Sequence, residues 1–320
     1  MVCYHPLYAI RFNNSINSKT GKHVSKVLQK ASTVKDLKLG NFISGGRSFY
    51  GYLVGCGKCI GCRLDYSRLW AVRLMKEVQT AKKACFITLT YTDDNLVYGK
   101  IPTLYHPHFI EFRDRLRAYL RYHYGKDFKI KYYMCGEYGS QNFRPHYHAI
   151  ITGFDFPDKV LEYETNGYPH YQSELLTKLW RKGRTEVCDA CFDTCAYVAR
   201  YITKKVNGSE ADTYYDGFQP EYSTCSKGIS YEWFKKFKND IYNTDVMVIY
   251  RKGQPFRIRP PRYFDFKLSQ EDPALLEFIK AKRERAMCLK PFEGTARLLD
   301  KEEYKKTIIS KTIHRKGDFL

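Results

Sequence analysis

The hydrophobic pattern of residues 67–152 alternates between a helical and a strand period, and this alternation constrains the fold most. Residues 84–91, 129–135 and 146–152 are short runs rich in β-branched and aromatic side chains, which are typical of strands. Residues 67–83 and 108–124 repeat apolar side chains every three or four positions, as amphipathic helices do. We therefore expect an α+β fold, in which an antiparallel sheet of these three strands carries helices on one face.

The charge balance of the chain favours a nucleic-acid partner. The 320 residues include 54 Lys and Arg against 34 Asp and Glu, a formal net charge of +20. Basic side chains bind phosphate groups and release their counterions. Aromatic residues make up 16% of the chain, and exposed rings can stack on single-stranded bases. A basic protein whose tyrosines belong to its core is the alternative on composition alone.

Two histidines at the start of the third strand are candidate metal ligands. Side chains on a strand alternate between its two faces, so His146 and His148 point one way and Tyr147 points the other. Glu137 stands nine residues before His146. Two imidazoles and a carboxylate form a three-ligand set with open positions, which suits Mg²⁺ or Mn²⁺. A pair of satisfied surface histidines is the alternative.

Residues 194–206 predict a helix that carries two tyrosines, with Thr194 as its N-cap. At ~100° per residue, Tyr197, Tyr201 and Lys204 fall within about 60° of one another, on one face. A phenol with its usual pKa of about 10 needs help to ionise. Lys204 or a metal-polarised phosphate would give that help. Two tyrosines at a helix–sheet contact are the alternative interpretation.

Three evenly spaced cysteines predict a structural zinc site. The spacing of Cys56 and Cys59 is that of a zinc knuckle, Cys62 follows at the same interval, and Cys3 or a histidine is the candidate fourth ligand. Free thiols in a turn before a helix are the alternative. The eleven cysteines are an odd number and do not resemble the framework of a secreted disulfide scaffold. A reducing cytoplasm fits them better.

A second group of cysteines, Cys188, Cys191 and Cys195, brackets the start of the predicted tyrosine helix. Metal binding is the less favoured interpretation there, because an ion would crowd the two tyrosines.

Outside these motifs the pattern is weaker. Residues 1–55 have poor periodicity and predict an N-terminal arm with a short helix near 24–30, and residues 207–228 predict a loop or linker. A basic helix, a hairpin around Gly253 and a charged, helical C-terminal part are expected after that, at 232–242, 246–258 and in the last 50 residues. No run of 18 apolar residues is present, and the N-terminus lacks the features of a signal peptide.

Three segments in this order resemble the motifs of a known superfamily. They are Phe86–Tyr91, Arg144–His148 and Tyr197–Lys204. Together they are similar to the three ordered motifs of rolling-circle replication initiators, the HUH endonucleases. Cys56–Arg63 adds a similarity to the replication initiation proteins of gokushovirus-type microviruses, which are single-stranded DNA phages. The resemblance covers roughly residues 50–206.

The resemblance implies a sheet with an RRM/ferredoxin-like core, the histidines on a central strand and the tyrosine helix beside it. His146, His148 and Glu137 would bind Mg²⁺ or Mn²⁺, and Tyr201 and Tyr197 would be the nucleophiles, aided by Lys204. Such a protein nicks single-stranded DNA at an origin, forms a 5′-phosphotyrosine and a free 3′-hydroxyl primer, and later rejoins the strand.

Two other classes of protein fit the motifs less well. A histidine-triad hydrolase would need a third histidine where Ile150 stands. A non-enzymatic zinc protein that binds nucleic acid explains the charge and the cysteines, but gives no reason for Tyr197 and Tyr201 to share a face.

The resemblance also implies a domain plan and partners. We expect an N-terminal arm at 1–55, an endonuclease core at 56–206 and a basic C-terminal extension at 207–320, packed on the core. No phosphate-binding loop of the Gly-x-x-x-x-Gly-Lys-Ser/Thr type is present, so strand unwinding would come from a host helicase, and synthesis from a host polymerase. The expected location is the cytoplasm of a bacterial host, without a membrane partner.

Overall fold

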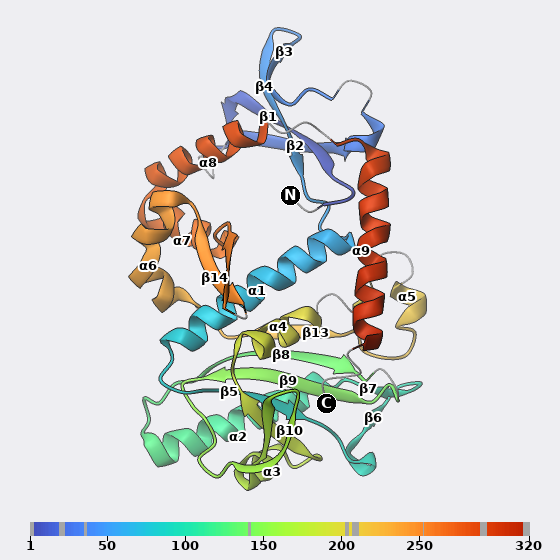
Figure 1. Ribbon diagram of the computed structural model, residues 1–320, viewed down its shortest axis with the longest axis vertical. Helices are drawn as coiled ribbons and strands as arrows, with labels where there is room; N and C mark the ends of the chain where they lie inside the picture. The colour runs from blue at the N-terminus through green and yellow to red at the C-terminus, as the bar shows by residue number, and fades with distance from the viewer. Residues whose placement is uncertain are drawn as a thin grey trace. The chain divides into compact units, whose positions relative to one another are not determined.

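An antiparallel sheet of seven strands organises the larger part of the chain (Figure 1). The structure is a computed structural model that describes residues 3–18, 23–34, 37–139, 142–201, 205–206, 211–251, 253–288 and 293–315. The strands of this sheet are β5 (Ala84–Leu89), β8 (Lys131–Tyr138), β9 (Pro145–Thr152), β10 (Val160–Thr165), β11 (Tyr168–Gln172), β12 (Thr185–Asp189) and β13 (Tyr222–Cys225). They lie in the order β10-β11-β12-β5-β9-β8-β13, and each neighbouring pair is antiparallel. The predicted α+β class with an antiparallel sheet is confirmed.

The three strands predicted from the sequence are neighbours at β5, β9 and β8. Strand β13 corrects the expected loop at 207–228. It is short and polar, and it becomes a strand because it pairs along β8, from Tyr222 opposite Gly136 to Cys225 opposite Tyr133.

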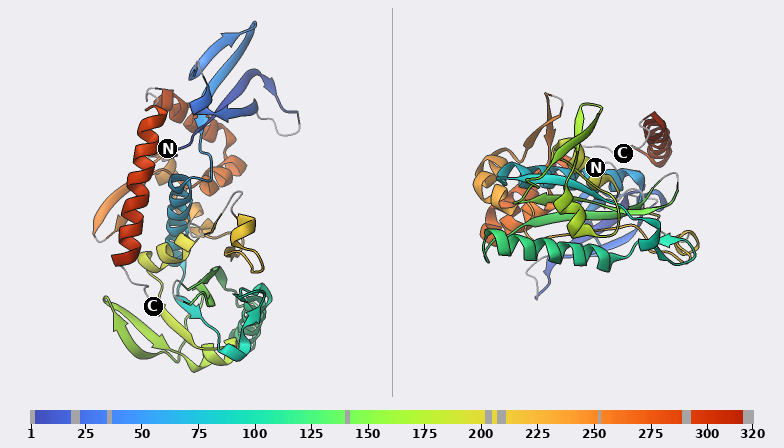
Figure 2. Two further views of the ribbon diagram at one scale, coloured as in Figure 1. Left: turned by 90° about the vertical axis from the view of Figure 1, so that its right-hand side faces the viewer. Right: turned by 90° about the horizontal axis from the view of Figure 1, so that it is seen from below.

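Helices cover both faces of the sheet, so the expectation of helices on one face is wrong. Helices α2 (His106–Tyr124) and α3 (Glu174–Trp180) pack on one face, and α4 (Phe192–Arg200) and the Ser67–Thr80 part of α1 (Ile60–Thr80) pack on the other. Figure 1 shows α2 and α4 on opposite sides of β8 and β9, and Figure 2 shows α2 along its face of the sheet. The reason lies in the strands, because β5, β8 and β9 are buried along almost their whole length and need cover on both sides.

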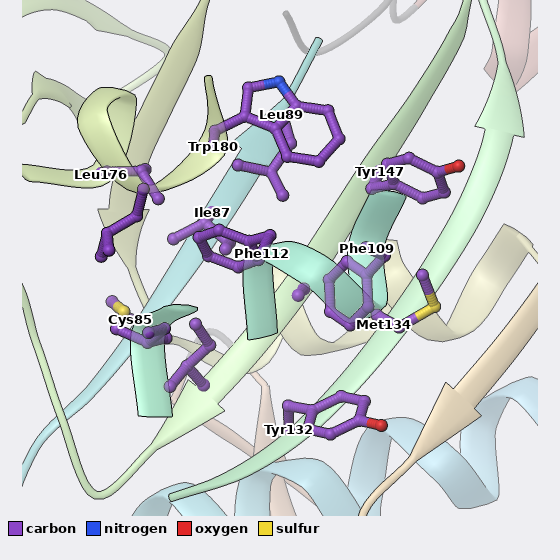
Figure 3. Packing of buried hydrophobic residues seen from close by; sticks show 14 of the residues in the cluster. Cys85, Ile87, Leu89, Phe109, Phe112, Tyr132, Met134, Tyr147, Leu176 and Trp180 are labelled. Atoms are coloured by element: carbon purple, nitrogen blue, oxygen red, sulfur yellow. The ribbon is translucent and has the colours of Figure 1, made fainter. Parts of the chain in front are cut away.

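The α2 side of the sheet holds the largest group of buried side chains (Figure 3). Phe109 and Phe112 of α2 lie against Tyr147 of β9 and Trp180 of α3, with ring centroids 5.9 Å apart for Phe109–Tyr147 and 6.2 Å for Phe112–Trp180. Full burial of one such side chain contributes roughly 1.5–3 kcal/mol. This core fixes the strand that presents the two histidines on the opposite face.

The chain forms two compact units, Met1–Tyr66 with Ser269–Asp318 and Ser67–Leu268. The first unit holds a four-stranded sheet in the order β2-β1-β4-β3. Its strands are β1 (Leu7–Ile16), β2 (His23–Lys30), β3 (Gly40–Ser44) and β4 (Arg47–Val54). The predicted helix near 24–30 is therefore wrong, and most of the expected arm is regular sheet. Local periodicity did not reveal β2, because its backbone is fixed by pairing with β1, from Leu7 opposite Lys30.

The predicted basic helix, hairpin and helical C-terminal part are confirmed. They are α6 (Tyr231–Thr244), the pair β14 (Met247–Arg251) and β15 (Gln254–Ile258), α7 (Arg262–Glu271), α8 (Pro273–Cys288) and α9 (Thr295–Arg315). The remaining short elements are η1 (Ala31–Thr33), η2 (Asp93–Asn95), β6 (Val97–Tyr98), β7 (Pro102–Thr103) and α5 (Ala211–Tyr214). Among the described residues, no helix is long and apolar enough to span a bilayer. The predicted functional division at 55 and 206 stays a prediction.

Candidate metal and tyrosine site

Strands β8 and β9 bring together the three predicted metal ligands. Their register places Glu137 opposite His146 and Cys135 opposite His148, so the three side chains share one face. Nε2 of His146 lies 2.7 Å from Oε1 of Glu137, and Nε2 of His148 lies 3.1 Å from the same oxygen. The three side chains thus converge on one point, as a metal site requires.

Hydrogen bonds at the other ring nitrogens orient both histidines. Nδ1 of His146 lies 3.1 Å from the carbonyl oxygen of Arg144, and Nδ1 of His148 lies 3.1 Å from Oγ1 of Thr88 on β5. Because the carbonyl oxygen can only accept, His146 donates there from Nδ1. Metal-binding histidines are typically held in this way through their second nitrogen. The donor set therefore fits a divalent ion, with Nε2 of each ring facing it.

The ligand set is buried, except at His146. Glu137 is 2% exposed and His148 is fully buried, whereas the His146 side chain keeps 15% of its surface exposed. Burial by itself raises the pKa of Glu137, but the hydrogen bonds from His146 and His148 outweigh it and lower that pKa to about 2. Glu137 is therefore a carboxylate at neutral pH, as a metal ligand must be.

The two predicted tyrosines both contact the buried histidine. The Tyr201 ring is stacked on His148, with centroids 5.4 Å apart and planes 9° apart. The Tyr197 ring meets His148 edge-on at 5.2 Å and meets Tyr201 at 4.8 Å. Phe86 stacks on His148 as well, at 5.4 Å. The predicted shared face of Tyr197 and Tyr201 is thus turned to the metal-ligand set.

The surroundings of Tyr201 disfavour its ionised form. Burial, and after it the negative charge of Glu137, raise the pKa of the Tyr201 phenol well above its usual value. Tyr201 is 6% exposed, while Tyr197 is half-buried. A cation held by Glu137 would act in the opposite direction on the phenol, because it would favour the phenolate.

The helix that carries Tyr197 begins earlier than predicted. Its N-cap is Cys191, and Thr194 is the third helical residue, so the assignment of Thr194 as N-cap is wrong. The Oγ1 atom of Thr194 accepts the backbone N–H of Cys191 at 2.8 Å, a reciprocal capping bond from inside the first turn. Tyr201 follows the last residue of α4 with a helical backbone. Lys204, the third predicted member of this face, lies outside the described residues.

The four predicted zinc ligands also come together, in the first unit. Their sulfur atoms, from Cys3, Cys56, Cys59 and Cys62, lie within 4.8 Å of one another, and all four cysteines are free. The backbone N–H of Cys56 donates to the Cys3 sulfur and that of Cys59 to the Cys56 sulfur, each at 3.3 Å. This four-cysteine cluster could bind Zn²⁺, and no histidine is needed as its fourth ligand.

A third group of ligand-type side chains was not predicted from the sequence. His170, Glu186 and Cys188 are all buried and lie within the same distance of one another. The spacing in the sequence groups Cys188 with Cys191 and Cys195, but Cys188 faces His170 of the neighbouring strand instead. Eighteen residues separate these two, and only the pairing of β11 with β12 reveals the contact.

Comparisons with known proteins agree with the site. Residues 84–206 match the family model of the replication-associated protein ORF2. The replication-associated protein ORF2 of Spiroplasma virus 4 is 36% identical over 243 residues, which cover 72% of this chain and 73% of that protein. The replication-associated protein VP4 of Bdellovibrio phage phiMH2K is 33% identical and covers 65% of each chain.

The replication-associated protein ORF4 of Chlamydia phage 1 is 31% identical, over 74% of this chain and 60% of its own length. No solved structure gives a significant match. The predicted resemblance to replication proteins of small phages is confirmed at the level of the family. This chain belongs to the family of the replication-associated protein ORF2.

Proposed function

We propose that this phage replication-associated protein initiates rolling-circle replication by nicking single-stranded DNA at an origin. The observation that supports this most strongly is that the rings of Tyr197 and Tyr201 both contact His148, within the convergent set of His146, His148 and Glu137. A merely structural helix–sheet contact has no need for a nucleophile-type side chain beside three ligand-type side chains. We also propose that the seven-stranded sheet contains the RRM/ferredoxin-like core of an HUH endonuclease.

The three ligand-type side chains are proposed to hold Mg²⁺ or Mn²⁺. Nε2 of His146, Nε2 of His148 and Oε1 of Glu137 would be the ligand atoms, because they already converge. When bound, the ion would polarise the scissile phosphate and stabilise the charge that develops on its oxygens. Thr88 and the carbonyl of Arg144 would keep the two rings oriented.

The proposed reaction is a transesterification on a tyrosine. The phenolic oxygen of Tyr201 or Tyr197 attacks the phosphorus, and the bond from phosphorus to the 3′-oxygen breaks. The 3′-oxygen takes up a proton and becomes the primer hydroxyl, while the 5′-phosphate stays on the tyrosine. The phenol proton passes to solvent or to Lys204. After one round, the second tyrosine cuts the regenerated origin, and the new 3′-hydroxyl displaces the first tyrosine and closes the circle.

Single-stranded DNA, a host helicase and a host polymerase are the proposed partners, in the cytoplasm of a bacterial host. The net charge of +20 supports the nucleic-acid partner. A zinc ion in the four-cysteine cluster is proposed to hold Met1–Tyr66 together locally, because Cys3 is 53 residues from Cys56 in the sequence.

The decisive experiment is trapping of a covalent adduct. Single-stranded oligonucleotides that tile the genome encoding this chain are incubated with the protein and Mg²⁺ or Mn²⁺, then separated by denaturing electrophoresis. One oligonucleotide should yield a protein–DNA adduct, and mass spectrometry should place the DNA on Tyr197 or Tyr201. The matched control is Tyr122→Phe, at a tyrosine that is 85% exposed, which should leave the adduct unchanged.

The competing function is that of a non-enzymatic zinc protein that binds nucleic acid. It predicts binding of the same oligonucleotides with no covalent adduct under any metal. Binding without an adduct across the whole tiling set would decide for that alternative, as would DNA attached at another residue.

A further inference from the structure

The third ligand-type group lies on the sheet face that also carries Glu137, His146 and His148. His170 of β11 stands opposite Cys188 of β12, and Glu186 is two residues before Cys188 on the same strand, so all three side chains point to one face. Their exposed fractions are only 6%, 6% and 4% for His170, Glu186 and Cys188. Nδ1 of His170 lies 2.7 Å from Oε1 of Glu186, and the Cys188 sulfur lies 3.4 Å from that nitrogen and 3.5 Å from that oxygen.

We propose that His170, Glu186 and Cys188 bind a Zn²⁺ ion, at a site separate from the metal and tyrosine site. The three ligand atoms all point at one another, which a single hydrogen bond between His170 and Glu186 would not require of Cys188. Zn²⁺ binds such atoms at about 2.0–2.3 Å, so tetrahedral ligands stand roughly 3.3–3.8 Å apart. Both distances from the sulfur already fall within this range, and only the His170–Glu186 distance must widen.

The chemistry of the donors selects the ion. An imidazole, a carboxylate and a thiolate are a mixed set that suits Zn²⁺, whereas Mg²⁺ prefers oxygen ligands alone. Binding releases the thiol proton of Cys188 to solvent. The ion then carries two positive charges against one thiolate and one carboxylate, with a neutral imidazole, so the buried group is neutral overall. A neutral group is far cheaper to bury than an unpaired charge. Water would take the fourth position.

A neighbouring tyrosine supports two of the three ligands. The hydroxyl of Tyr163, on β10, donates to Oε2 of Glu186 at 2.7 Å, which leaves Oε1 for the ion. The Tyr163 ring also stacks on His170, with centroids 4.4 Å apart and planes 11° apart. Outer partners of this kind fix the orientation of metal ligands.

The position of the group assigns a structural role to the ion. Thr88 stands opposite both Glu186 and His148, so these two residues are two strand spacings apart, about 10 Å. That is too far for a pair of metals that share one phosphate, which stand about 3.5–4 Å apart. Helix α4 begins at Phe192, four residues after Cys188. The ion would therefore fasten the edge strands to the segment that leads into the tyrosine helix.

Metal analysis of variants tests the proposal, and it needs no DNA or nicking activity. Wild-type protein, Cys188→Ser and Cys225→Ser are purified with zinc and without chelator, and zinc per chain is measured. We expect Cys188→Ser to hold one ion fewer than wild type. Cys225→Ser, at an exposed cysteine, should hold the wild-type number. Tyr163→Phe should keep the ion with ~10–100-fold weaker affinity, because it deletes only the outer hydrogen bond.

Cobalt substitution separates this site from the other two. In a Cys56→Ser/Cys59→Ser background, Co²⁺ should still give a thiolate charge-transfer band, and that band should vanish when Cys188→Ser is added. The set of Glu137, His146 and His148 has no thiolate and gives no such band. Equal zinc content in folded wild type and Cys188→Ser, or no thiolate band in the double-serine background, would overturn the proposal. If Cys188→Ser does not fold, Glu186→Gln replaces it in both measurements.

Discussion

At the residue scale, one buried histidine links the two halves of the candidate site. His148 lies within hydrogen-bond distance of Glu137 through Nε2 and of Thr88 through Nδ1, while its ring is stacked between Phe86 and Tyr201. Its position is thus set by both strands and by the segment that follows α4. Changes at its neighbours should therefore alter metal binding and tyrosine reactivity separately.

The two phenols are expected to differ in importance. Tyr201→Phe and Tyr197→Phe each keep the ring that packs on His148, and remove only the nucleophilic oxygen. We predict that each single variant retains some single-round cleavage, with Tyr201→Phe the more damaged, and that the double variant forms no adduct. Denaturing electrophoresis of single-turnover reactions measures this. An undiminished adduct in the double variant would return this helix to a structural role.

Removal of the Thr88 hydroxyl should weaken metal binding without disturbing the core. Thr88→Val has nearly the same shape and deletes the hydrogen bond to Nδ1 of His148, so the ring loses its outer partner. We expect Mn²⁺ affinity, measured by calorimetry, to fall ~10–100-fold while the unfolding temperature changes little. Thr244→Val, at an exposed helix end, is the control. Equal Mn²⁺ affinity of the Thr88 variant and wild type would argue against this orienting role.

At the element scale, the sheet holds its shape because helices bury both of its faces. Helix α2 contributes Phe109, Phe112, Leu116 and Leu120 to one side, each about 1% exposed. The opposite face is thereby free to present charged and phenolic groups, which contribute less to packing. The stability of the site should therefore depend on residues that never touch it.

Truncation of Phe112 should destabilise the fold. Phe112→Ala leaves a cavity beside Trp180 and Phe109, and we predict a loss of ~3–5 kcal/mol in the free energy of unfolding. Urea denaturation measures it. Tyr122→Ala, on the exposed side of the same helix, should change the free energy by less than ~0.5 kcal/mol. A similar effect of both variants would mean that α2 is not packed as described.

The four-cysteine cluster should behave as a separate structural element. We predict that it contributes one zinc ion per chain, in addition to the ion proposed at Cys188. Cys59→Ser should remove that ion and destabilise Met1–Tyr66, because Cys3 and Cys56 lose their common partner. Elemental analysis and limited proteolysis of the N-terminal part measure the two effects. Unchanged zinc content in Cys59→Ser would favour the interpretation of free thiols.

At the scale of the whole molecule, the net charge of +20 should dominate affinity for DNA. If about six phosphates are neutralised, the affinity for a single-stranded oligonucleotide should fall about 300-fold between ~50 and ~200 mM salt, a slope of about −4. Fluorescence anisotropy measures it. A neutral-backbone oligonucleotide of the same sequence is the control, and its weaker binding should hardly depend on salt. A flat dependence for the charged oligonucleotide would mean that base stacking prevails.

The sequence by itself determined those features that follow from a local period. Alternation along one strand places His146 and His148 on one face, and a helical period places Tyr197 and Tyr201 together. Both hold in the structure, as do the strand and helix types of the most periodic segments. These patterns are readable because each depends only on backbone geometry within a few residues.

Tertiary structure alone decided the features that join distant segments. Glu137 meets His146 through the register of β8 and β9, and Cys3 reaches Cys56 across more than 50 residues. His170 meets Cys188 only because β11 pairs with β12. Register and strand pairing arise from the packing of the whole sheet between two layers of helices. No local period carries that information, so the third ligand-type group and the second layer of helices could be found only in the fold.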